Sequence, residues 1–77
     1  MIVTDKSAQN WNKKVEFDKI TTLYLENLNI KRILFKTIQW NNLLILSLKN
    51  NSLNKIVFIN NMPNLYFLDI RNNMVII

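Results

Sequence analysis

The sequence contains no cysteine, no histidine and no glycine, and each absence excludes a class of chemistry. Without cysteine the chain can form neither a disulfide nor a thiolate metal site, and it has no thiol nucleophile. Without histidine it lacks the commonest general base, so Ser7, Ser47 and Ser52 have no histidine to activate them. A serine–lysine pairing stays open, but no motif supports one. We therefore expect a protein that is not an enzyme and that uses no metal or cofactor.

Glycine-rich loops and long hydrophobic runs are also missing. Without glycine the chain cannot build the glycine-rich type of phosphate-binding loop. No apolar run approaches the roughly 20 residues that span a bilayer. The N-terminal stretch MIVTDKSAQN has no basic segment followed by an apolar core, which a signal peptide would show. The length of 77 residues gives room for one small domain, and we expect it to be cytoplasmic, with no contact to a membrane.

One spacing of apolar residues recurs along the chain. The segment LLILSLKNNSL, residues 43–53, fits neither an amphipathic helix nor a half-buried strand. Its defining positions are Leu43, Leu46, Leu48, Asn51 and Leu53. The same spacing returns later at Leu65, Leu68, Ile70, Asn73 and Val75, and it occurs earlier at Ile20, Leu23, Leu25, Leu28 and Ile30. An apolar residue also precedes each copy by three positions, at Phe17, Trp40 and Met62. Only Leu28 breaks the pattern, because it stands where asparagine is expected.

This pattern resembles the leucine-rich repeat, L-x-x-L-x-L-x-x-N-x-L, of the short class found in a protein phosphatase regulatory subunit and in bacterial internalins. The resemblance implies an α/β-type repeat solenoid with a short parallel sheet on its concave face and irregular or 3-10 return segments. It divides the chain into repeats at 20–42, 43–64 and 65–77, of which the last is incomplete. Residues 1–19 are then a degenerate N-terminal partial repeat or a cap. Counting back one period from the first copy places Val3, Ala8 and Trp11 in repeat columns.

Physical arguments agree with stacked strands. Leu46 and Leu48 lie two positions apart, so both point inward from one short strand. The repeat spacing puts Leu23 and Leu68 beside Leu46, and stacking buries a column that no single repeat could bury alone. We expect Asn51 and Asn73 to turn inward and to hydrogen-bond backbone groups of the neighbouring turns. The return segments should close the far side of the core with Phe35, Ile38, Phe58 and Ile59.

Residues that alternate with the inward leucines face outward, on the surface that such folds use for binding. One outward column holds Tyr24, Ser47 and Asp69, with Ile2 or Thr4 before them, and another holds Thr22, Ile45 and Phe67. Tyr24, Phe67 and Arg71 are the strongest candidates, because aromatic residues and arginine dominate interface energetics. The full set of predicted partner-binding residues is Tyr24, Glu26, Ser47, Lys49, Phe67, Asp69 and Arg71. The alternatives are lateral packing of the aromatic rings on the sheet and ion pairs within the chain.

The net charge of +5 raises the question of nucleic acid. The basic residues are scattered along the sequence, whereas a nucleic-acid binder would carry a basic stripe on one face. We therefore expect a non-catalytic module that binds an unidentified protein partner, and attraction of an acidic partner is the milder inference from the charge. The alternatives are a nucleic-acid-associated basic protein and a non-functional fragment of a longer leucine-rich repeat protein. Uncapped repeats would also allow end-to-end self-association.

Overall fold

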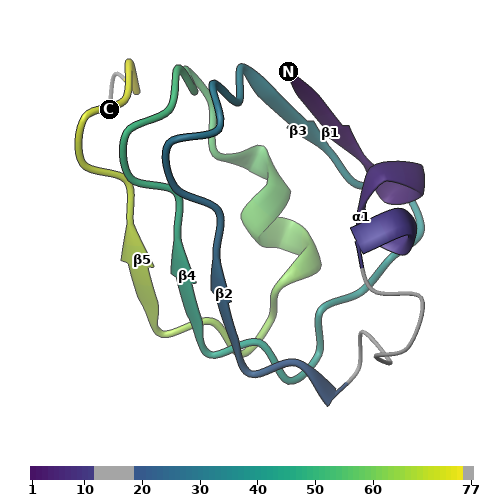
Figure 1. Cartoon of the computed structure of the whole chain (residues 1–77). Helices are drawn as coiled ribbons and strands as arrows, with labels where there is room; N and C mark the ends of the chain where they lie inside the picture. The colour runs from purple at the N-terminus through teal and green to yellow at the C-terminus, as the bar shows by residue number, and fades with distance from the viewer. Residues whose placement is uncertain (12–18, 76–77) are drawn as a thin grey trace.

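The computed structural model describes residues 1–11 and 19–75, with the side chains of residues 9–11 excepted, and Figure 1 shows the arrangement. Its elements are the strands β1 (Ile2–Thr4), β2 (Thr22–Tyr24), β3 (Arg32–Leu34), β4 (Ile45–Ser47) and β5 (Phe67–Asp69), the helix α1 (Asp5–Trp11) and the 3-10 helix η2 (Val57–Asn61). Two predicted repeat positions, the Trp11 side chain and Phe17, lie outside the described residues. Among the described residues, no helix is long and apolar enough to cross a membrane.

Three strands form a parallel sheet in the order β2-β4-β5, on one side of the molecule in Figure 1. Leu46 lies beside Leu23 on one neighbouring strand and beside Leu68 on the other, as the sequence spacing predicts. The backbone hydrogen bonds recur with the same period. The N–H of Leu25 donates to the carbonyl of Ser47, and in the next repeat the N–H of Leu48 donates to the carbonyl of Asp69, both at 2.8 Å.

The N-terminal strand belongs to a second sheet. β1 pairs in parallel with β3, and Val3 lies beside Ile33 in that register. The prediction that Ile2 or Thr4 continues the Tyr24 column of the first sheet is therefore wrong. The physical reason is burial: β1 lies against β3, where Val3 is fully enclosed in the core.

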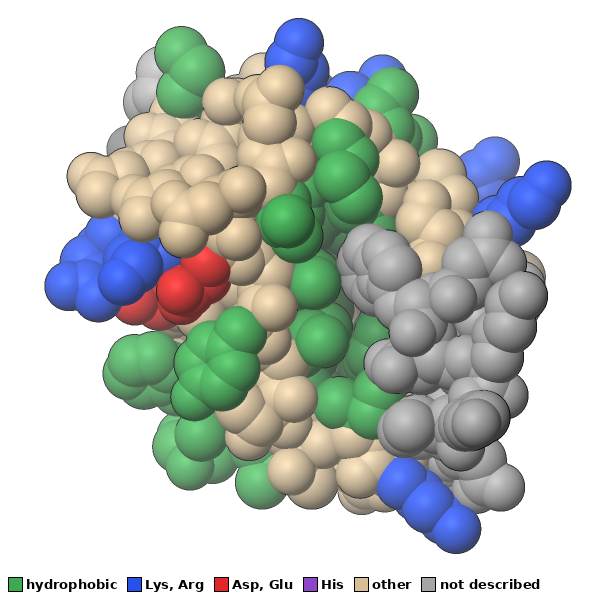
Figure 2. Space-filling view, viewed as in Figure 1, with side chains coloured by type: hydrophobic (Ala, Val, Ile, Leu, Met, Phe, Trp, Pro, Cys, Tyr) green, Lys and Arg blue, Asp and Glu red, His purple; other side chains and the backbone are tan. Residues whose placement is uncertain are grey.

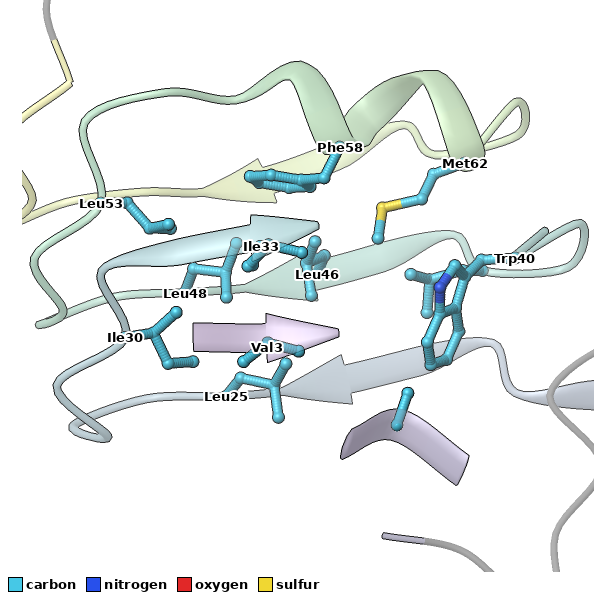
Figure 3. Packing of buried hydrophobic residues seen from close by; sticks show 12 residues of the cluster. Val3, Leu25, Ile30, Ile33, Trp40, Leu46, Leu48, Leu53, Phe58 and Met62 are labelled. Atoms are coloured by element: carbon cyan, nitrogen blue, oxygen red, sulfur yellow. The ribbon is translucent and has the colours of Figure 1, made fainter. Parts of the chain in front are cut away.

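The core lies between the two sheets and is closed by η2, as Figure 3 shows. Its largest fully buried side chains come from both sheets and their connections: Trp40, Ile30, Leu43, Leu46, Leu48, Leu53 and Val3. The Trp40 ring packs against the Phe35 ring, with the centroids 5.5 Å apart. Of the residues predicted to close the far side, Phe58 is buried and Phe35 and Ile38 are half-buried. Ile59 is exposed, which corrects the prediction, because the short η2 turns only one of its faces toward the core.

The side chain of Asn51 joins two neighbouring turns, as the sequence predicts. Its Oδ1 accepts hydrogen bonds from the N–H groups of Leu28 and Ile30, both at 3.0 Å. Its Nδ2 donates to the carbonyls of Leu25 at 2.7 Å and Leu48 at 2.9 Å. Asn51 thereby satisfies buried backbone groups that would otherwise lack partners.

Asn73 repeats this arrangement in the next copy of the pattern. Its Oδ1 accepts from the N–H of Leu53, and its Nδ2 donates to the carbonyls of Leu48 and Ile70. Leu28, the exception to the pattern, is 42% exposed. The first copy therefore needs no inward asparagine, because its position in that column faces solvent.

Asparagine also replaces glycine at the turn that follows each strand of the larger sheet. Asn27, Asn50 and Asn72 have φ angles of 60°, 61° and 59°, in the left-handed region. Asparagine enters this region more readily than other residues with a Cβ. A chain without glycine can therefore make the same tight turn three times.

This turn gives a stability prediction. We expect Asn27→Gly to leave the free energy of unfolding nearly unchanged and Asn27→Ala to lower it by about 1 kcal/mol, since alanine carries the left-handed penalty of roughly 1–2 kcal/mol. Urea denaturation followed by circular dichroism measures both. Equal losses in the two variants would show that the φ angle is not the cause.

Candidate functional site

The outer face of the β2-β4-β5 sheet carries the residues that the sequence singles out, and we call it the outer sheet face. It consists of Thr22, Tyr24, Glu26, Ile45, Ser47, Lys49, Phe67, Asp69 and Arg71. The inward leucines of the same strands hold it in place by filling the core. Figure 2 shows apolar side chains over the starts of these strands, with acidic and basic side chains beyond them on the β4–β5 side.

Tyr24 and Phe67 stand out on this face because they are large, apolar and open to solvent. The exposed fraction is 67% for Tyr24 and 53% for Phe67. Tyr24 lies on β2 and Phe67 on β5, so β4 separates them. Thr22 and the half-buried Ile45 lie in register with Phe67 on the other two strands of the sheet. The arrangement gives two exposed rings on a hydrogen-bonded sheet.

Ser47 behaves differently from the prediction. It is only 3% exposed, so the expectation of an accessible residue in the middle of this face is wrong. Its hydroxyl donates a hydrogen bond to the carboxylate of Glu26 on the neighbouring strand connection. The small side chain is covered because longer neighbours flank it across the sheet. Ser47 therefore fixes the position of Glu26, which stays half-buried.

Asp69 and Arg71 form an ion pair at the end of β5. The Arg71 Nη2 donates to Asp69 Oδ2 at 2.8 Å, and Nε donates to Asp69 Oδ1 at 3.0 Å. The side-chain hydrogen bond from Arg71 lowers the pKa of Asp69 below its ordinary value, with help from the Arg71 backbone N–H. The structure thus bears out the alternative of an ion pair within the chain for these two residues, although the Arg71 side chain remains 74% exposed.

This pair predicts a pH dependence. NMR titration should place the Asp69 pKa below 3.8, and Arg71→Gln should return it toward that value. Because folding lowers this pKa, the pair stabilises the fold above the unfolded-state pKa, and the contribution is lost as pH falls through the folded-state pKa. The stability difference between the wild type and Arg71→Gln should therefore shrink in acid. An Asp69 pKa that is the same in both proteins would contradict this assignment.

The sequence reading missed two exposed residues at the starts of the strands. Tyr66 is 73% exposed and Leu44 is also exposed, and both directly precede an outward-facing residue of their strand. They occupy the same column of successive repeats, so the repeat itself could have identified them. They add exposed apolar surface directly before β4 and β5.

Comparisons with known proteins leave this surface without an assigned role. No family model, no curated protein and no solved structure matches the chain. Within the described part of the chain, acidic side chains do not gather into a group of three or more that could hold a metal ion.

Proposed function

We propose that this chain is a non-catalytic protein-interaction module of the leucine-rich repeat type, which binds a protein partner on the outer sheet face. The observation that carries the proposal is the pair of exposed rings, Tyr24 and Phe67, on a sheet whose inward side is a packed core. Exposed aromatic residues are the commonest energetic anchors of protein interfaces. In the family that the sequence resembles, the corresponding surface is the concave face.

The scaffold under this face favours binding because little order has to be gained. Leu46 and Leu48 are buried beneath the middle strand, and Asn51 ties the turn that follows it to the previous one. Binding to a surface that is already ordered avoids the entropy cost of fixing a loop. The rings of Tyr24 and Phe67 then have only their own rotamers to restrict.

The charge of the face indicates what kind of partner it fits. Glu26 and Asp69 balance Lys49 and Arg71, so the face as a whole is neutral. Attraction by net charge is therefore not what this surface offers. The outer sheet face suits a partner that has an apolar patch to contact the two rings and charged groups of both signs to lie near Asp69 and Arg71.

The test is affinity capture from native lysate with paired baits. One bait is the wild type and the other carries Tyr24→Ala and Phe67→Ala, which lie outside the core. The control bait carries Ile2→Ala and Ile59→Ala, two exposed apolar residues on β1 and η2, away from the outer sheet face. We expect a protein that the wild type and the control retain and that the double variant loses.

The captured protein is then measured against the purified baits by isothermal calorimetry. Loss of two anchors of about 2 kcal/mol each, about 4 kcal/mol if they add, should weaken binding roughly 1,000-fold. Circular dichroism must show all baits equally folded. Equal affinity for the wild type and the Tyr24→Ala/Phe67→Ala bait would overturn the proposal.

A further inference from the structure

The net charge of the chain lies away from the outer sheet face. The four charged residues of that face cancel, and the undescribed stretch 12–18 contains two acidic and two basic residues. The other basic residues are Lys6, Lys19, Lys31, Arg32, Lys36 and Lys55, and Asp5 is the only acidic residue left to oppose them. The carboxylate of Asp5 accepts hydrogen bonds from the backbone N–H groups of Lys36 and Thr37. Any attraction of an acidic partner by net charge would therefore act on the rest of the molecule.

Three of these basic residues meet at one hollow. It measures about 310 Å³ and lies between β3 and the segment that leads into η2, whose positions can be followed in Figure 1. Its walls are Lys31, Arg32, Ile33 and Leu34 on one side and Asn54, Lys55 and Val57 on the other. Val57 is 63% exposed and Leu34 is also exposed. The hollow thus combines positive charge with apolar surface, and none of its lining residues is acidic.

The backbone at this hollow is also open. Ile33 faces the core, and β3 pairs with β1 along one edge. Alternate residues of a parallel strand bond to opposite sides, so the N–H and C=O groups of Arg32 and Leu34 point away from β1. Among the described residues, no backbone hydrogen bond joins β3 to residues 54–57. The two segments hold equivalent places in successive repeats, yet they separate here, whereas the strands of the larger sheet stay paired.

From these features we infer that the hollow beside β3 is a second binding site, which takes an extended acidic segment of a protein partner as an added strand. The segment pairs its main chain with the Arg32 and Leu34 backbone groups. Its carboxylates meet Lys31, Arg32 and Lys55, and its apolar side chains meet Leu34 and Val57. Strand addition of this kind draws affinity from main-chain hydrogen bonds and specificity from alternate side chains.

The occupant is a peptide because the hollow offers main-chain partners and apolar contacts. A nucleic acid would use the same lysines and arginine through its phosphates, but it has no use for the open β3 edge. The two occupants therefore differ in a measurable way. Binding of a peptide must weaken when the N–H groups of the peptide are blocked. Binding of a nucleic acid must not depend on hydrogen bonds to the open edge of β3.

The experiment measures fluorescence anisotropy of a labelled eight-residue peptide, Glu-Glu-Val-Val repeated twice, which presents glutamate and valine in turn along each face of an extended strand. Three comparison probes are the same peptide with glutamine in place of glutamate, the glutamate peptide with alternate backbone nitrogens methylated, and a single-stranded oligonucleotide. We expect micromolar binding of the glutamate peptide. Each modified peptide should bind at least about tenfold more weakly, because one loses the charge and the other loses the main-chain donors.

Two variants with the same change in net charge locate the site. Arg32→Glu should weaken binding of the glutamate peptide at least about tenfold, while Lys6→Glu, which changes an exposed residue of α1, should change it less than about twofold. Circular dichroism checks that both are folded. Equal binding of the methylated peptide, equal loss in the two variants, no binding of the glutamate peptide, or tighter binding of the oligonucleotide would each overturn the proposal.

Discussion

Replacing Asn51 with alanine should destabilise this protein more than any other polar substitution, by about 3–5 kcal/mol, since each buried backbone group left without a partner costs about 1–3 kcal/mol. The side chain serves the N–H groups of Leu28 and Ile30 and the carbonyls of Leu25 and Leu48. A chain of this length has a folding free energy of roughly 4–12 kcal/mol at ordinary values per residue. Asn51→Ala should therefore lose a large share of the folding free energy, and its melting temperature should fall accordingly.

Urea denaturation of matched variants in the same column tests this expectation. Asn73→Ala removes the equivalent hydrogen bonds at a half-buried position and should cost about half as much, because water can reach the groups it leaves. Leu28→Asn places the missing asparagine at an exposed position and should change stability by less than about 1 kcal/mol. A loss below about 1 kcal/mol for Asn51→Ala would show that the hydrogen bonds of the inward asparagine side chains are not what holds the turns together.

The second large effect is expected at Leu46. Leu46→Ala should lower the free energy of unfolding by about 3–4 kcal/mol, within the range of about 2–5 kcal/mol for a buried leucine. Leu46 is buried beneath the middle strand, whereas its partners Leu23 and Leu68 on the outer strands are only half-buried. Truncation of Leu46 therefore removes more buried surface and leaves a more enclosed cavity.

Leu23→Ala and Leu68→Ala provide the matched controls. They remove the same atoms from the same column and should each cost about half as much, because part of the side chain is already in water. Thermal and urea unfolding of the three variants give the comparison. Three equal losses would mean that the column is not enclosed in the middle as the structure has it.

The outer sheet face and the hollow beside β3 make separate predictions. The first is neutral and carries two exposed rings, and the second is basic and flanked by an open strand edge. Tyr24→Ala with Phe67→Ala should leave the glutamate peptide bound, and Arg32→Glu should leave the partner of the outer sheet face bound. The two proposed sites can therefore fail or hold independently.

The register of the larger sheet was predictable because its cause is local. Leu46 and Leu48 are two positions apart, which places them on one face of a strand, and the repeat spacing places Leu23 and Leu68 beside Leu46. The inward asparagines were predictable for a similar reason. A polar residue that recurs among buried leucines must find backbone partners, and Asn51 and Asn73 do.

The left-handed turns were present in the sequence as the column of Asn27, Asn50 and Asn72, but their φ angles were not deduced from it. The absence of glycine was the available signal. Three tight turns in a chain without glycine require the residue that best tolerates positive φ, which is asparagine. The signal for these turns therefore lies in the asparagine column of the sequence and not in the leucine spacing.

By itself, the sequence determined which residues share a strand face, which positions repeat, and that histidine- and cysteine-based chemistry is excluded. Only the tertiary structure decided that β1 lies against β3, that Ser47 is covered, and that Lys31, Arg32 and Lys55 meet at one hollow. The physical reason is the separation along the chain between the residues that set each feature. The direction of a side chain follows from its neighbours along the strand, whereas pairing partners, burial and charge clusters depend on which distant segments compete for the same core.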